Sequence, residues 1–419
     1  SAASDVYKRQ SVLSAFFAAV QTSSANPSDV SARQVLLTSA QTLSNRFNSI
    51  SNQLNQQKES INGQLSTMSD QVNQLTASIA SLNKQITQVQ GSSNSAPANL
   101  LDARNEAVRS LNELVGVTAS EKNGVFSVST GTGQSLVLGD QSNTISAVPS
   151  ASDPSQYTIQ LNAGGGTAID LGNVLSGGSI GGLLRYRSDA LMPAINDLGR
   201  IAIATADTVN SQLGQGLDLN GDFGTSLFKD INSAAAIAQR SQGAAGNSVG
   251  SGNLNVSIKD SSKLSTYDYK VTFTSGSNYT VMRSDGKAMG AFDTTTTPPP
   301  VIDGFTLALD GKGPVGAGDS FKVSPTANGA TNIGTDLTDA NKIAFAGPLL
   351  GEGSKTNQGT GTFTPPTLTL PIDIHGGADT AQLRTGIEHS MPVKMVFGKP
   401  AADGTQAYTC LLYTSPSPR

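Results

Sequence analysis

The chain has 419 residues, of which 14% are charged and 37% hydrophobic, with a net charge of −4, two His and one Cys. This length suits two or three domains, and one Cys excludes an internal disulfide or a thiolate metal cage. The absence of Lys/Arg runs argues against nucleic-acid binding, and no stretch approaches the roughly 20 apolar residues of a membrane-spanning helix, which excludes membrane insertion.

The two ends match translated sequencing adapter. Ser1 to Gln10 reads SAASDVYKRQ and Cys410 to Arg419 reads CLLYTSPSPR, the products of the two ends of a common transposase adapter. We therefore expect the natural segment to be Ser11 to Thr409, an internal piece of a longer gene. The 27 basic and 31 acidic residues then become 24 and 30, a net charge of −6, because four adapter charges are removed: Asp5, Lys8, Arg9 and Arg419.

The first natural residues imitate a secretory signal peptide. Lys8 and Arg9 precede the apolar run SVLSAFFAAV. Once Lys8 and Arg9 are assigned to the adapter, the apolar run lacks the charged region of a signal peptide, and that interpretation no longer holds. The spacing instead predicts one face of a helix, formed by Val12, Leu13, Phe16, Phe17 and Val20.

The strongest periodic signal predicts a long helix from about Pro27 to Val89, on the order of 90 Å at 1.5 Å per residue. Asn26 to Asp29 supplies a turn and an N-cap ahead of it. Apolar residues recur every seventh position as in a coiled-coil seam: Phe47, Leu54, Ile61, Met68, Leu75, Leu82 and Val89. Four companions follow members of this series by four positions: Leu65, Val72, Ile79 and Ile86.

The rest of the helix is mostly Ser, Asn, Gln and Thr, and of these Ser, Asn and Thr are mediocre helix formers. Stability must therefore come from other helices packed on the seam. We expect this partner to lie in missing ends of the protein or in another subunit, so that the isolated chain is partly disordered along the helix.

Shorter elements follow in chain order. The pattern predicts a second helix antiparallel to the first, two β-hairpins and a third helix: 99–115, 125–128 with 136–138, 157–161 with 168–171, and 180–213. After Phe228 the composition shifts to Gly, Ser, Thr and Asp, and short strands are predicted at 254–258, 267–273, 279–282, 305–309 and 321–323.

These patterns predict an α+β multidomain fold, with a long coiled-coil-like rod followed by all-β outer domains. The predicted domains are consecutive: a mainly helical domain with a β-hairpin insert over 11–228, a β-rich domain over 229–347 and a truncated β-rich domain over 348–409.

One candidate metal site lies in DLNGDFG. Asp218, Asn220 and Asp222 have the spacing of a calcium loop. However, Phe223 stands where that loop needs Gly, and Lys229 where it needs a bidentate Glu. A turn held by Asx hydrogen bonds is therefore the preferred interpretation.

Three other patterns also favour structural interpretations. A GxGxxG match at 311–316 precedes a strand rather than a helix, which favours a hairpin loop over dinucleotide binding. The glycines of 177–182 favour a helix-capping turn over a phosphate site, because no Lys-Ser or Lys-Thr pair follows. His375 and His389, with Asp373 and Asp379 nearby, lack the spacing of a metal site. We expect no catalytic site and no cofactor.

Three stretches of the chain are distinctive, and the third is highly specific. They are FFAAVQTSSANPSDVSARQVLLTSAQTLSNRFNSIS from Phe16, ANLLDARNEAVRSLNELVGV from Ala98, and GGLLRYRSDALMPAINDLGRIAIATADTVNSQLGQGLDLNGDFGTSLF from Gly181. Together they resemble the flagellar hook-associated protein 1 family.

The resemblance implies a structural protein of the bacterial flagellum, exported and assembled as a ring between hook and filament. Its implied partners are further copies of itself, the hook protein, the second junction protein and an export chaperone that binds the missing C-terminus. The seam residues would build the helical layer, whose exposed faces would contact neighbouring subunits. Alternatives are a secreted β-rich adhesin or phage tail fibre, an extracellular enzyme within 348–409, and a sister axial protein.

Overall fold

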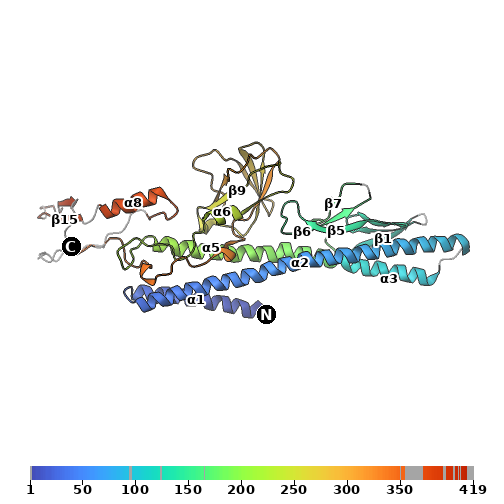
Figure 1. Ribbon diagram of the computed structural model, residues 1–419, viewed down its shortest axis with the longest axis horizontal. Coiled ribbons are helices and arrows are strands. Elements are labelled where there is room, and N and C mark those ends of the chain that lie inside the picture. The colour runs from blue at the N-terminus through green and yellow to red at the C-terminus, as the bar shows by residue number, and fades with distance from the viewer. Residues whose placement is uncertain are drawn as a thin grey trace. The chain divides into compact units, whose positions relative to one another are not determined.

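The computed structural model describes residues 2–93, 97–122, 125–164, 166–349, 351–353, 371–389 and 393–399, and most of 402–412, with side chains from Ser11. Much of the expected β segment at 364–374, and residues 413–419 of the adapter match, lie outside the described residues. The fold is α+β and multidomain, as predicted (Figure 1).

The chain forms two compact units, and both are discontinuous in sequence, whereas the predicted domains are consecutive. Unit 1 comprises Ser1–Arg46, Ala204–Asp230 and Ile333–Arg419. Unit 2 comprises Phe47–Ile203, termed the helical body below, and Ile231–Asn332, termed the β-domain.

The predicted helices are present. They and the shorter helices are α1 (Ala2–Ala25), α2 (Val30–Ser93), α3 (Ala98–Val115), α4 (Gly178–Tyr186), α5 (Met192–Leu213), α6 (Ala234–Gln239), α7 (Gly329–Asn332) and α8 (Ala378–His389). The expected N-cap of α2 is confirmed, because Asp29 Oδ1 accepts a hydrogen bond of 2.8 Å from the Ser31 amide.

A π-helical turn, Arg187–Leu191, joins α4 to α5 inside the predicted third helix. Pro193 lies two residues after the end of this turn, and it has no amide hydrogen to donate to the carbonyl four residues earlier. The wider turn accommodates this loss, since the Met192 amide bonds to the Arg187 carbonyl five residues back. The sequence analysis did not anticipate this turn.

Two small antiparallel sheets belong to the helical body, and both predicted hairpins are confirmed within them. The four-stranded sheet has the order of its sequence: β1 (Val117–Lys122), β2 (Val125–Thr130), β3 (Ser135–Leu138) and β4 (Gln141–Ser142). The three-stranded sheet contains β5 (Thr144–Pro149), β6 (Tyr157–Asn162) and β7 (Ile169–Asp170).

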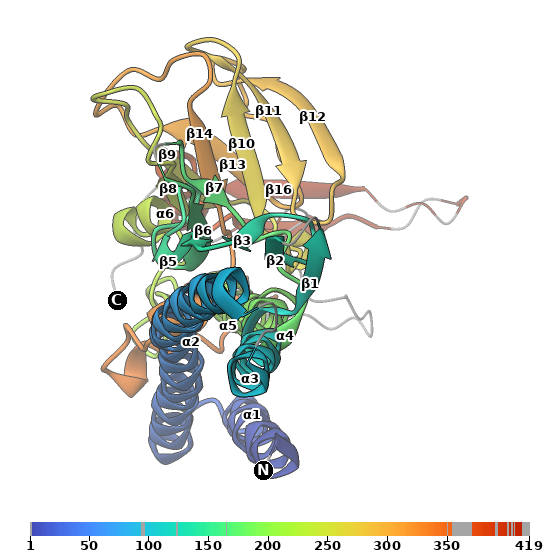
Figure 2. The same ribbon diagram turned by 90° about the vertical axis from the view of Figure 1, so that its right-hand side faces the viewer.

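The β-domain contains all five predicted strands in two sheets (Figure 2). The first sheet has the order β12 (Ala288–Asp293), β11 (Asn278–Arg283), β10 (Tyr269–Phe273), β14 (Ser320–Val323) and β8 (Ser241–Gly243). The second pairs β13 (Phe305–Leu309) with β9 (Leu254–Ile258). Alternate residues of β10 are buried, as expected for a strand with one face on the core, and Tyr269 meets Phe305 edge to face.

Unit 1 has a core of its own. Phe16 of α1 is fully buried and lies 5.7 Å, centroid to centroid, from Phe228. Arg33 of α2 is also buried, and its guanidinium donates to the carbonyls of Pro27, Ala340 and Ile343. A buried arginine thus satisfies backbone acceptors that would otherwise lie unpaired.

The expectation for residues beyond 348 needs correction. The sequence predicts a β-rich segment, but α8 occupies Ala378–His389. Strand β15 (Val393–Phe397) agrees with the prediction and pairs with β16 (Tyr408–Leu412). The last three residues of β16 belong to the adapter match.

Candidate assembly surfaces and polar sites

The predicted seam of α2 is the centre of the helical body. Among the eleven seam residues, six are buried: Phe47, Ile61, Leu65, Val72, Ile79 and Ile86. The other five are half-buried: Leu54, Met68, Leu75, Leu82 and Val89. None of the eleven is fully exposed, so the seam is covered along its length within this chain.

The cover comes from the chain itself, which corrects the expectation that the partner lies in missing ends or in another subunit. One cluster joins Leu65 and Val72 of α2 to Leu111 of α3. The same cluster contains residues from the two small sheets and from α4: Val128, Leu136, Val137, Ile145, Ile159, Leu161, Ile180 and Leu184. In Figure 1, α3 and strands β1, β5 and β6 lie along this part of α2.

Asparagines of α2 bind the strands beside the seam, a role that the sequence analysis missed. The Asn73 side chain donates to the Ile145 carbonyl and accepts from the Ile145 amide, both at 2.8 Å. Asn62 bridges the Ser155 carbonyl and the Tyr157 amide in the same way. Asn83 donates to the Gly139 carbonyl at 2.7 Å. These side chains bind backbone groups of strands and of the loops that adjoin them, so that fewer polar groups are left unpaired beside the seam.

A signal for these asparagines exists in the sequence. Asn62, Asn73 and Asn83 are separated by eleven and ten residues, about three helical turns, so they share a face. Asn is unfavourable in a helix interior, which means that its repetition on one face points to a hydrogen-bonding role.

Three of the exposed large apolar residues in the described part of unit 1 lie on α1 and α2, and others lie on α8, on β15 and β16 and in a loop. Phe17 of α1 is half-exposed although its neighbour Phe16 is buried. On α2, Val30 and Val35 are likewise exposed, while Leu36 and Leu37 are buried. These helices therefore keep apolar side chains outside the core of unit 1.

The loop of the calcium-like motif, DLNGDFG, is an Asx turn, which is the interpretation that the sequence favours. Asp218 Oδ1 accepts hydrogen bonds from the amides of Asn220 at 2.7 Å and Asp222 at 3.0 Å. The Asn220 side chain also donates to Asp218 Oδ2. The carboxylate of Asp218 is thus engaged by its own loop. Within the described residues, no group of three or more His, Cys, Asp and Glu is placed to hold a metal ion.

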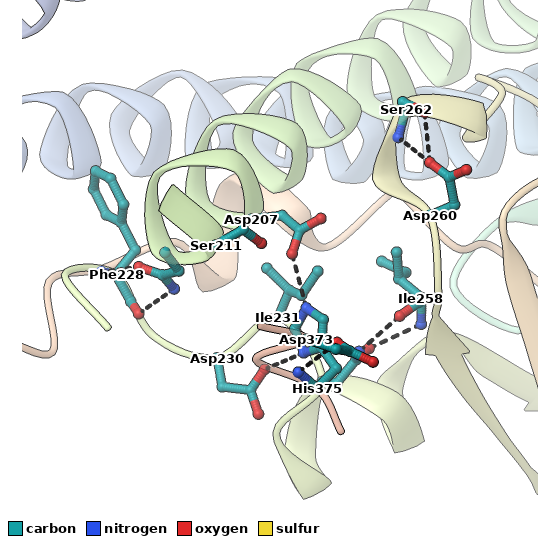
Figure 3. Close-up of polar contacts among 12 residues, drawn as sticks. Asp207, Ser211, Phe228, Asp230, Ile231, Ile258, Asp260, Ser262, Asp373 and His375 are labelled. Atoms are coloured by element: carbon teal, nitrogen blue, oxygen red, sulfur yellow. Dashed lines mark hydrogen bonds and ion pairs between the residues drawn. The ribbon is translucent and has the colours of Figure 1, made fainter. Parts of the chain in front are cut away.

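His375 lies among three carboxylates (Figure 3). Its Nε2 is 2.8 Å from Asp207 Oδ1 on α5, and its Nδ1 is 3.9 Å from Asp230 Oδ1. Asp373 accepts a hydrogen bond from the His375 backbone amide. The hydrogen bond to Asp207 raises the pKa of His375 above 6.5, and burial opposes this rise. His389 does not join the cluster, since it is exposed on α8.

A proton titration by NMR tests this cluster, because the chain has only two histidines. We expect the His375 imidazole to titrate above 6.5, and Asp207→Asn to lower its pKa. The protonated ring stabilises unit 1 at pH values below 6.5, and this contribution is lost as the pH rises through the raised pKa. His389→Gln assigns the two signals. Titration of His375 at or below 6.5 would contradict the geometry.

The two glycine motifs serve the fold. Gly177 caps α4, which confirms the capping turn, and a Cβ on Gly178 would lie 2.4 Å from the carbonyl carbon of Leu114. The GxGxxG match at 311–316 connects β13 to β14, which belong to different sheets. It is therefore a crossover loop and not the hairpin loop that the sequence predicts.

No helix in the described part of the chain is long and apolar enough to cross a membrane. The family described as the helical domain of flagellar hook-associated protein FlgK matches residues 7–228. The D2-like domain of flagellar hook-associated protein 1 matches residues 243–325.

Individual relatives point to the same family as these two matches. Flagellar hook-associated protein 1 of Escherichia coli K12 is 32% identical over 393 residues, which cover 88% of this chain and 69% of the relative. The protein of the same name from Salmonella typhimurium is 32% identical over 343 residues, covering 80% of this chain and 59% of the relative.

A solved structure extends the likeness to the fold. The flagellar hook junction protein FlgK from Burkholderia pseudomallei superposes with a TM-score of 0.81 at 31% identity, covering 97% of this chain and 72% of that chain. Sequence and fold agree along nearly the whole chain, and neither an adhesin nor a phage fibre is favoured. The chain belongs to the flagellar hook-associated protein 1 family.

Proposed function

We propose that this chain is part of a structural protein that joins the hook of a bacterial flagellum to its filament. The observation that carries the proposal is the match of 7–228 to the helical domain of the family, together with the buried seam that organises this region. The family is one of structural flagellar proteins, and the packed core around the seam gives the helical body the character of a scaffold.

The proposed assembly surface is the outer face of the unit 1 helices. The seam of α2 is occupied within the chain and is therefore a scaffold element, not a contact between subunits. Phe17, Val30 and Val35 remain exposed and can bury apolar area against a neighbouring copy. The further partners we propose are the hook protein, the second junction protein and an export chaperone bound beyond this segment.

Complementation of a strain that lacks the junction protein tests this surface. We expect Phe17→Asp together with Val35→Asp, introduced into the full-length gene, to abolish filament attachment. Each substitution places a charge where the proposed contact with a neighbouring subunit would bury an apolar side chain. Gln71→Asp together with Gln74→Asp is the matched control, since both residues are exposed and polar on the part of α2 that belongs to unit 2. A thermal melt of each purified variant confirms that unit 1 is intact. Normal filaments on cells with the double variant would refute the proposed surface.

A further inference from the structure

A cluster of three charged side chains lies in unit 2, where a strand of the β-domain meets the helical body. Lys322 on β14 places its Nζ 2.7 Å from Asp153 Oδ2 and 3.2 Å from Asp268 Oδ2. The side chains are only 20%, 10% and 18% exposed, respectively. Salt and water therefore screen this cluster far less than they screen a surface ion pair.

The three residues come from three segments. Asp153 lies in the loop between β5 and β6, which belongs to the helical body. Asp268 directly precedes β10, and Lys322 lies on the neighbouring strand β14, so both belong to the β-domain. The loop residue Asp153 is itself held in place by hydrogen bonds from Ser155 and Gln156.

Both carboxylates are needed because Lys322 also faces another lysine. In the antiparallel register of β10 and β14, Lys270 lies directly opposite Lys322. Like charges in such a pair destabilise a sheet. The carboxylates of Asp153 and Asp268 offset this repulsion, and Asp153 also lies within the field of Arg187.

A second attachment of the β-domain lies at α7. Asn48 of α2 donates to the Ala330 carbonyl at 2.8 Å, and Ser51 shares a hydrogen bond of 2.7 Å with Thr331. Gly199 of α5 approaches so closely that a Cβ there would lie 1.8 Å from the Thr326 carbonyl oxygen. One attachment alone would leave the β-domain free to rotate about it, as domains joined through small polar interfaces generally do.

We propose that α7 is a pivot and that the ion-pair cluster of Lys322, Asp153 and Asp268 is a lock that stops rotation of the β-domain about it. With the lock formed, the β-domain keeps a fixed orientation on the helical body. This inference does not depend on the proposed function or on the assembly partners. Three further contacts lie near the lock: Asn196 of α5 donates to Asp268 Oδ1 and to the Thr266 carbonyl, each at 3.0 Å, and the Ala245 amide donates to the Ala151 carbonyl.

Distance measurements between spin labels test the lock on the whole chain. Cys410→Ser first removes the single thiol of the chain, and Ser66→Cys on α2 and Ala291→Cys on β12 then introduce labels at two exposed positions. We expect a single narrow distance distribution for this parent. Lys322→Met should broaden the distribution or add a second distance, because the β-domain then moves about α7. Lys322→Arg should keep the narrow distribution.

Two variants separate the lock from general effects. Lys270→Met removes the neighbouring, exposed lysine and should leave the distribution narrow. Asp153→Asn keeps the size of the side chain and, through Oδ1, the hydrogen bonds from Ser155, whereas Nδ2 can accept neither from Gln156 nor from Lys322. It carries the test if circular dichroism shows that Lys322→Met is unfolded. Narrow distributions in both Lys322→Met and Asp153→Asn would overturn the proposal, as would equal broadening in Lys270→Met.

Discussion

Truncation of Leu65 to alanine is expected to lower the free energy of unfolding by about 2–5 kcal/mol, the usual cost of such a cavity in a well-packed core. Leu65 is fully buried at the centre of the α2 seam, where α3, both small sheets and α4 converge. Urea denaturation of the purified chain, followed by circular dichroism, measures the change.

Alanine substitutions at two further positions on α2 give changes in stability to compare with that of Leu65→Ala. Leu82 is half-buried, so its truncation should cost clearly less than that of Leu65. Ser66 is exposed, and Ser66→Ala should change stability by no more than about 0.5 kcal/mol. Equal effects of all three substitutions would show that the seam is not packed within this chain.

Glycine-to-alanine substitutions in two helices are expected to have opposite signs. A Cβ on Gly199 of α5 would meet the Thr326 carbonyl oxygen at 1.8 Å, a backbone atom that cannot rotate away. The segments must therefore separate, and such overpacking typically costs about 1–3 kcal/mol. Gly63 of α2 has no atom within 4 Å of a Cβ, so Gly63→Ala should stabilise by about 0.5–1 kcal/mol through helix propensity.

Thermal melts of the two glycine variants provide this comparison in one experiment. The same chemical change is made in both, so differences in the unfolded chain largely cancel. If Gly199→Ala melted at or above the temperature of the parent, the close approach of α5 to 326–329 would be wrong.

Elements with strong periodicity could be predicted from sequence. The seven-residue repeat from Phe47 gives α2 within a few residues, and alternation gives β10 and β13. The Asx turn at Asp218 followed from the residues that break the calcium pattern. In each case the information lies in neighbouring residues.

The partners of these elements could not be predicted in the same way. A seam of apolar residues indicates that another part of the structure covers α2, but helices and sheets can both supply that cover. The chain uses short, weakly patterned strands such as β5, anchored by Asn73. The pairing of Lys322 with Asp153 was equally invisible, because it joins residues 169 positions apart.

Helix α8 and the π-helical turn show two other limits of prediction from the sequence. The sequence that precedes α8, TPPTLTLPIDI at 364–374, is apolar and typical of strands, and it led to the prediction of strands for the whole region. The turn at Arg187–Leu191 depends on a single residue, Pro193, whose effect on a helix ranges from a kink to a register change.

Hydrogen exchange of the purified chain, read by mass spectrometry, tests most directly the claim that the α2 seam is packed within the chain. The account predicts that peptides covering 61–86 exchange as slowly as those from the core strand β10, and that both are released only by global unfolding. Exchange of 61–86 within seconds, beside a protected β10, would contradict it. The helix would then need a partner from outside the chain.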